Sequence, residues 1–179
     1  MKSLRLIASF FLITLSLILN SCSNEPIDPA IDLNSFLNTG ITGTYLLTAF
    51  NSSVTVDLNG DGIRSTNQLD ETNCFNGNTL TLSADNTFIA TSKGLDIVTN
   101  GTNNVIECFV DPNTTGIWEL NGSILSLTYT ESGNVYTDEY AVSGSTLTYS
   151  INNGEIVGTT ATAEPVYLNA DIDLIYSKQ

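Results

Sequence analysis

The chain has 179 residues and carries 5 Lys and Arg side chains against 19 Asp and Glu, a formal net charge of −14. Nucleic acids bind basic side chains that neutralise their phosphates, so this balance argues against a nucleic-acid partner. The sequence contains no histidine, which excludes histidine-based zinc sites and hydrolases built on Ser-His-Asp or Cys-His pairs. We therefore expect a protein that is not an enzyme.

Residues 1–21 have the pattern of a secretory signal peptide. Lys2 and Arg5 precede an apolar run from Leu6 to Leu19, which at about 14 residues is shorter than the roughly 20 that span a bilayer. The run ends in Leu19-Asn20-Ser21-Cys22, which resembles the lipobox of bacterial lipoproteins. The resemblance implies cleavage before Cys22, lipidation of that cysteine, and a lipid-anchored protein of the cell envelope at the outer membrane. An ordinary signal peptide followed by a chance cysteine is the alternative.

Residues 22–39 are polar and contain Pro26 and Pro29, so we expect a tether between the lipid and a folded domain that spans residues 40–179. Removal of residues 1–21 leaves 158 residues, which suits one domain with one core. The remaining chain has 3 basic residues against 19 acidic ones, a net charge of −16. Such a surface suits solvent or divalent cations as partners.

From Ile41 onward the sequence predicts short β-strands, because runs rich in Thr, Val, Ile, Leu and Tyr are separated by Asn, Gly, Asp and Ser. Leu125, Leu127 and Tyr129 alternate with polar residues, which predicts one buried and one solvent-facing side. The predicted strands are 41–50, 53–57, 78–84, 87–92, 104–110, 115–120, 123–130, 134–143, 146–152, 155–162 and 167–177.

Tight turns connect these strands. The predicted hairpin turns are Asp85-Asn86, Asn121-Gly122, Ser132-Gly133, Ser143-Gly144 and Asn153-Gly154. Short strands in this order form an antiparallel meander, and closing the meander removes its exposed edges. We therefore predict an all-β fold, an antiparallel up-and-down β-barrel, with a two-layer β-sandwich as the alternative.

A loop after the first strands resembles the front half of a calcium-binding loop. Oxygen-bearing side chains at positions 1, 3 and 5 with glycine at position 6 suit a hard cation. Position 12 is Gln68 in place of the usual glutamate, so Asp70 or Glu71 would have to supply that ligand. The candidate ligands are Asp57, Asn59, Asp61, the carbonyl of Ile63, and Glu71. The alternative is an acidic turn loop that binds no metal.

Two cysteines remain after Cys22. In an exported protein such an even pair indicates a disulfide, so we expect Cys74 and Cys108 to be bonded to each other. A reactive thiol pair is the alternative, but no C-x-x-C spacing and no nearby cation supports it.

Aromatic residues recur on the predicted strands. They suit a cavity that takes an apolar ligand, and they suit equally the filled core of a small barrel. The candidate lining residues are Tyr45, Phe88, Trp118, Tyr129, Tyr140 and Tyr149, with Tyr176 on the last strand.

A series of short motifs resembles the lipocalin-like lipoproteins of Bacteroidetes-type bacteria over residues 40–177. The motifs are Gly43-Thr44-Tyr45-Leu46-Leu47, Asp57-Leu58-Asn59-Gly60-Asp61-Gly62, Glu71-Thr72-Asn73-Cys74, the run from Asn78 to Phe88, and Gly116-Ile117-Trp118. The resemblance implies an antiparallel β-barrel with a central cavity.

Two functional hypotheses follow. The first is a lipid-anchored envelope protein whose lipocalin-like barrel binds a small apolar ligand. The second is a surface accessory or adhesion module, stiffened by calcium, that contacts another envelope protein or a glycan. An apolar cavity of several hundred Å³ favours the first hypothesis.

Overall fold

The computed structural model describes residues 40–101 and 103–179. The predicted signal peptide, the tether and Cys22 lie outside these residues. Within them, no helix is long and apolar enough to cross a membrane. The elements are β1 (Gly43–Val56), β2 (Ser65–Asn67), the 3-10 helix η1 (Gln68–Asp70), β3 (Thr79–Leu82), β4 (Thr87–Thr91), β5 (Lys93–Asn100), β6 (Asn103–Val110), β7 (Thr114–Asn121), β8 (Ile124–Glu131), β9 (Asn134–Ser143), β10 (Thr146–Thr159) and β11 (Pro165–Lys178).

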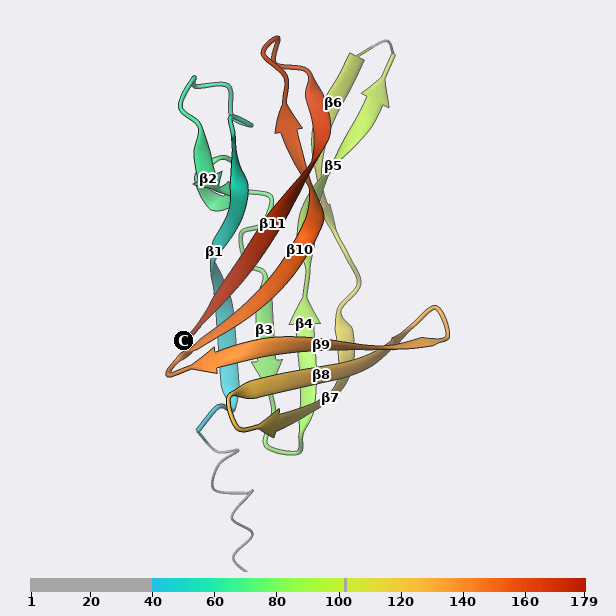
Figure 1. Ribbon diagram of the computed structural model, residues 1–179. Coiled ribbons are helices and arrows are strands. Elements are labelled where there is room, and N and C mark those ends of the chain that lie inside the picture. The colour runs from blue at the N-terminus through green and yellow to red at the C-terminus, as the bar shows by residue number, and fades with distance from the viewer. Residues whose placement is uncertain (1–39, 102) are drawn as a thin grey trace, which may run out of the picture. The chain divides into compact units, whose positions relative to one another are not determined.

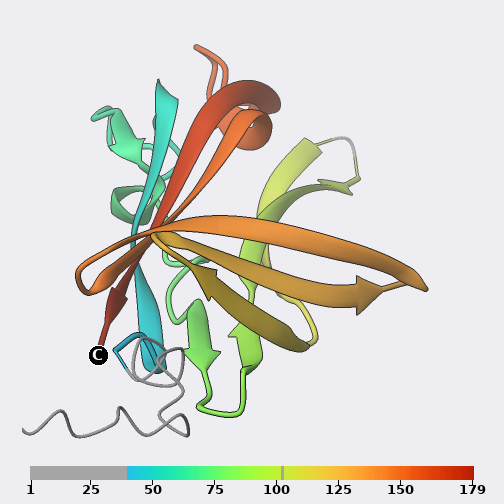
Figure 2. The ribbon, with the colours of Figure 1, turned by 60° about the horizontal axis from the view of Figure 1, so that its bottom comes forward.

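Eight strands form a closed antiparallel barrel in the order β1-β3-β4-β7-β8-β9-β10-β11. The ring closes because β11 returns to pair with β1, with Tyr45 opposite Lys178 and Ser52 opposite Ile172. The predicted barrel is therefore confirmed. The sandwich is not observed, because this pairing joins the two edges that a sandwich would leave open. Figures 1 and 2 show β7, β8 and β9 running side by side across the barrel, at a steep angle to β3 and β4.

Four of the five predicted turns connect neighbouring strands, and each has left-handed backbone, at Asn86 (φ 63°), Gly122 (φ 62°), Gly133 (φ 82°) and Gly144 (φ 58°). The fifth prediction, a hairpin turn at Asn153-Gly154, is wrong. Asn153 (φ 52°) is a bulge within β10, and its N–H donates to Asp171 Oδ1 at 2.9 Å. The bulge absorbs the left-handed residue while β10 keeps pairing with β11, so one strand replaces the two predicted at 146–152 and 155–162.

Two more strand predictions are corrected. The predicted strands 41–50 and 53–57 are one strand, β1, whose register shifts between Leu47 and Ala49. The strand β5 was not predicted, because its Lys93-Gly94 start and its charged Asp96 interrupt the apolar pattern. It forms because its whole length pairs with β6, from Lys93 opposite Val110 to Asn100 opposite Asn103.

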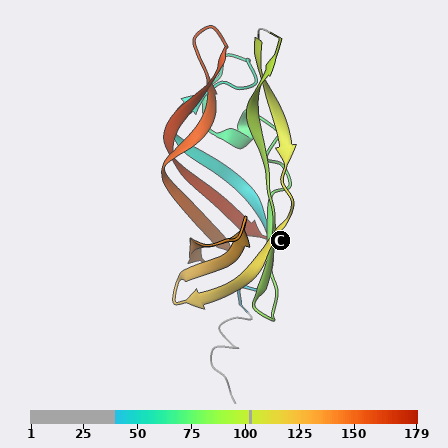
Figure 3. The ribbon, with the colours of Figure 1, turned by 90° about the vertical axis from the view of Figure 1, so that its right-hand side faces the viewer.

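Two hairpins continue past the barrel at one end. The hairpin arm, residues 93–110, consists of β5 and β6 and extends the pairing of β4 with β7. The β10–β11 arm consists of Gly154–Thr159 paired with Pro165–Ala170. Figure 3 shows the two arms on opposite sides, with η1 and the end of β1 between them.

The core has two clusters of buried apolar side chains. The barrel cluster fills the ring and includes Tyr45, Phe88, Trp118 and Leu147. The second cluster packs between β1 and the β10–β11 arm, around Val56, Ile156, Ala170 and Ile172. Alternation along each strand directs these side chains to the inside of the sheet.

Candidate ligand-binding site

Most of the predicted lining aromatics belong to the barrel cluster. Tyr45 is 1% exposed, and its hydroxyl donates to the Ile41 carbonyl at 2.7 Å. Trp118 is equally enclosed, and its indole N–H donates to the Ser83 carbonyl at 3.0 Å. Both side chains satisfy their polar groups within the protein, so they act as core residues.

Three of the predicted residues, Phe88, Tyr129 and Tyr140, line a small cavity of about 120 Å³ inside the barrel. Tyr176 lines it too, from β11. Tyr149 does not line this cavity but stacks on Tyr140, with ring centroids 5.0 Å apart. In the described part of the chain, aromatic rings therefore occupy much of the barrel interior around this small cavity.

The carboxylate of Asp138 lies among these aromatic rings. Asp138, on β9, accepts hydrogen bonds from the Tyr129 hydroxyl at 3.1 Å and the Tyr149 hydroxyl at 3.2 Å. Burial, followed by the negative charge of Asp138, raises the pKa of Tyr129 to about 12. The same two causes raise the pKa of Tyr149, and burial raises the pKa of Tyr140. Burial alone raises the pKa of Tyr176 to about 12.

A larger cavity, of about 350 Å³, lies between the hairpin arm and the β10–β11 arm. Its volume falls in the range of small-molecule sites, which are mostly apolar with a few polar groups. Its lining residues are Phe50, Gln68, Phe75, Gly94, Leu95, Asp96, Phe109, Glu155, Ile156, Val157 and Tyr167. This cavity is the candidate ligand-binding site, and none of the aromatic residues predicted to line a cavity contributes to it.

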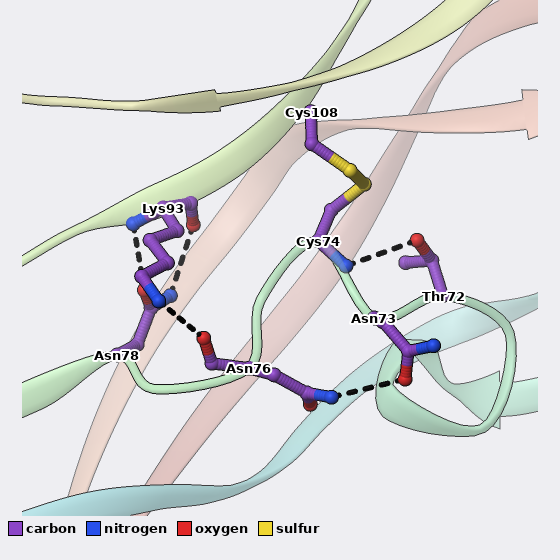
Figure 4. The surroundings of a disulfide bond; sticks show 7 residues. All are labelled: Thr72, Asn73, Cys74, Asn76, Asn78, Lys93 and Cys108. Atoms are coloured by element: carbon purple, nitrogen blue, oxygen red, sulfur yellow. Dashed lines mark hydrogen bonds between the residues drawn. A yellow bond between two sulfur atoms is a disulfide. The ribbon is translucent and has the colours of Figure 1, made fainter.

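A disulfide holds one wall of the cavity in place. Cys74 and Cys108 are bonded, as predicted, with their Cα atoms 5.1 Å apart (Figure 4). Phe75 and Phe109 directly follow the two cysteines, so the bond brings both rings to the same site. Phe75 packs on Phe50 of β1, with ring centroids 4.7 Å apart.

Polar contacts join the same loop to the base of the hairpin arm. The Asn78 side chain donates to the Lys93 carbonyl at 3.0 Å and accepts from the Lys93 N–H at 2.6 Å (Figure 4). The Lys93 ammonium donates to the Asn76 carbonyl at 2.9 Å. The Asn78 amide thus supplies the two bonds that a neighbouring strand would supply, and the start of β5 is held against the residue before β3.

Close approach at Gly94 shapes the cavity wall. A Cβ atom on Gly94 would lie 2.5 Å from Cζ of Phe109, its partner across the hairpin, so the ring covers the glycine directly. Phe109 nevertheless stays 43% exposed, which is unusual for a large aromatic side chain. An exposed aromatic wall beside a cavity is available for contact with a bound molecule.

The two arms are also joined across the cavity. The Tyr167 hydroxyl donates to Asp96 Oδ1. The Ile97 N–H also donates to Asp96 Oδ1, at 2.7 Å, and the Tyr167 bond followed by this one lowers the pKa of Asp96. Asp96 therefore stays ionised at neutral pH. The second charged lining residue, Glu155, is also acidic, and within residues 40–101 and 103–179 no lysine or arginine lines the cavity.

The predicted calcium loop is an exposed turn whose oxygens accept hydrogen bonds from its own backbone. Asp57 accepts from the N–H groups of Gly60 at 2.8 Å and Gly62 at 3.0 Å. Asn59 Oδ1 accepts from the Asp61 N–H at 2.9 Å. These bonds keep the loop folded as a series of turns.

The remaining candidate ligands of this loop lie in different surroundings. Ile63 is exposed, and its N–H donates to Asp61 Oδ1 at 2.7 Å. Glu71 is buried and accepts from the Leu58 N–H at 3.0 Å. Over residues 40–101 and 103–179, no three His, Cys, Asp or Glu side chains gather as a metal site requires. Calcium binding stays a prediction.

The chain belongs to the family of lipocalin-like domains, whose family model matches residues 41–149. No curated protein and no solved structure matches the chain. The family match ends within β10, at Tyr149, so the cavity residues from Glu155 to Val157 and Tyr167 lie beyond it.

The disulfide should contribute strongly to stability. Replacing Cys74 and Cys108 together by serine should lower the free energy of unfolding by about 3–4 kcal/mol, because a loop of roughly 35 residues is no longer closed in the unfolded chain. Urea denaturation of the double variant and the parent measures the difference. Alkylation of both cysteines in protein isolated without reductant would contradict the bond.

The buried tyrosines should make stability depend on alkaline pH. The pKa values of Tyr129 and Tyr176 are raised from 10.0 to about 12, so above pH 10 the unfolded chain loses protons that the folded chain keeps. The free energy of unfolding should therefore hold below pH 10 and fall between pH 10 and 12. Urea denaturation across this range should show a smaller fall for Tyr129→Phe and Tyr176→Phe. An equal fall in parent and variants would contradict the assignment.

Proposed function

We propose that the protein binds a small, mainly apolar molecule in the cavity between its two arms, and that Cys22 anchors it by lipid to the cell envelope. The cavity supports the first part: it has a volume of about 350 Å³ and is lined mostly by apolar and aromatic side chains. Membership of the lipocalin-like family is compatible with small-ligand binding. The lipobox-like ending at Cys22 supports the second part.

The proposal is one of binding without catalysis. Histidine is absent from the sequence, and the charged lining residues are the two acids Asp96 and Glu155 on separate arms. Asp96 is engaged with Tyr167 and the backbone of Ile97. The second hypothesis, an accessory or adhesion module, rests on the sequence alone and stays a prediction.

The cavity should bind an uncharged apolar probe such as 1,6-diphenylhexatriene, whose fluorescence rises in apolar surroundings. Phe109→Ala removes an exposed aromatic wall and should weaken binding about tenfold, the equivalent of about 1.4 kcal/mol. Val110→Ala is the control, because Val110 is 67% exposed, points to the other face of β6 and does not line the cavity. Equal losses in both variants, or no probe binding by the parent, would contradict the proposed site.

Anchoring makes a separate prediction. Protein purified from its own membranes should enter the detergent phase and carry acyl mass on Cys22. Cys22→Ser should remove that mass, and should either release the protein from the membrane or block its processing. Phase partition and mass spectrometry measure both effects. Membrane retention of Cys22→Ser without acyl mass would refute the lipid anchor.

A further inference from the structure

One polar side chain in the cavity has an unused hydrogen-bonding atom. Gln68 is the first residue of η1, which Asn67 caps by accepting the Leu69 N–H at 3.3 Å. Gln68 is only 2% exposed and lines the cavity. Its Nε2 donates to Ser52 Oγ at 3.2 Å.

The orientation of the Gln68 amide follows from the proton of Ser52. Ser52 Oγ lies 2.6 Å from the Val54 carbonyl and 3.3 Å from the Thr66 carbonyl, and carbonyls only accept, so the single hydroxyl proton points to them. Ser52 Oγ can therefore only accept from Gln68. The NH₂ group of the amide must face Ser52, and Oε1 must face away from it.

This Oε1 atom opens into the cavity. Among the described residues, Oε1 of Gln68 has no hydrogen-bond partner. In the same part of the chain, every fully buried side-chain oxygen or nitrogen has a partner, so Oε1 is not fully buried. Oε1 must therefore keep some access to space outside the protein. Because the side chain is almost wholly enclosed and lines the cavity, that access is through the cavity. A ligand that fills the space must satisfy this acceptor or lose the hydrogen bonds that water makes to it.

The charge of the lining limits the ligand further. Asp96 and Glu155 are acidic, and no basic side chain of the described residues lines the cavity to balance an anion. The nearest lysine along the hairpin arm, Lys93, turns its ammonium to the Asn76 carbonyl. A carboxylate ligand would meet only like charges, whereas an uncharged ligand avoids this repulsion.

We propose that the cavity selects an uncharged apolar molecule with a hydroxyl group that donates a hydrogen bond to Oε1 of Gln68. This inference rests on the proposed ligand-binding function and specifies its ligand. The aromatic rings of Phe50, Phe75 and Phe109 pack on the apolar body. A neutral donor meets the buried acceptor without the cost of burying a charge.

A ligand series on the unmodified protein tests the inference. Decanol, 1-methoxydecane and decanoate share a chain and differ in the polar end: a hydroxyl donor, an ether without a donor, and an anion. Displacement of 1,6-diphenylhexatriene should give the tightest binding for decanol and binding about three- to tenfold weaker for 1-methoxydecane, because one hydrogen bond is lost. Decanoate should bind weakest.

A variant pair locates the contact at Gln68. Gln68→Met keeps the length of the side chain and removes the acceptor, so decanol should fall to the affinity of 1-methoxydecane while 1-methoxydecane is unchanged. Gln179→Met, at the only other glutamine of the sequence, is the control and should alter neither the affinity for decanol nor that for 1-methoxydecane. Thermal unfolding checks that each variant is folded. If Gln68→Met does not fold, the ligand series on the unmodified protein tests the inference by itself.

The possible failures are distinct. If decanol and 1-methoxydecane bind the parent equally, or if decanoate binds as tightly as decanol, the inference is wrong and the proposed function stands. If the probe and all three ligands fail to bind, the proposed function is wrong as well.

Discussion

The pairing of β1 with β11 is the constraint on which the rest of the structure depends. It joins residues more than a hundred positions apart, from Tyr45 opposite Lys178 to Ser52 opposite Ile172, and turns an open meander into a ring. Closure pairs each barrel strand with a neighbour on both sides, although the pairing of β9 with β10 covers only Ala141–Ser143 and Thr146–Thr148. Beyond the last β1–β11 pair, Val56 at the end of β1 packs with Ile156 and Ala170 of the β10–β11 arm.

The filled barrel explains why the candidate site lies at its end. In a ring of eight strands, inward side chains are just large enough to fill the interior, and here tyrosines and Trp118 do so. Among the described residues, the cavity inside the barrel has a volume of about 120 Å³, whereas the cavity between the arms has about 350 Å³. The disulfide fixes one arm to the loop before β3, and the hydrogen bond from Tyr167 to Asp96 joins that arm to the other.

Local chemistry predicted much of this fold. Alternation placed most strands, Asn86 and Gly144 marked real turns, and the count of cysteines predicted the disulfide. The wrong predictions are cases in which pairing with another strand determines the local structure. Asn153-Gly154 is a bulge because β11 continues to pair beside it, and β5 forms because β6 pairs with it. The cavity could not be predicted from spacing, since its residues come from seven separate stretches of the chain between Phe50 and Tyr167. The sequence feature that pointed to the cavity was the phenylalanine that follows each bonded cysteine, because the disulfide brings Phe75 and Phe109 to the same site.

The barrel cluster and the cavity between the arms are built from different residues, and this separation determines which substitutions the chain tolerates. Among the described residues, no side chain of the barrel cluster lines the larger cavity. Substitutions in the cavity wall therefore leave the barrel cluster intact, and a change of ligand does not require the ring to be repacked. Specificity and stability meet instead at Ile156 and Phe50, which belong both to the cavity wall and to the second cluster and its packing, so a substitution at either position changes the cavity and the support of the β10–β11 arm together.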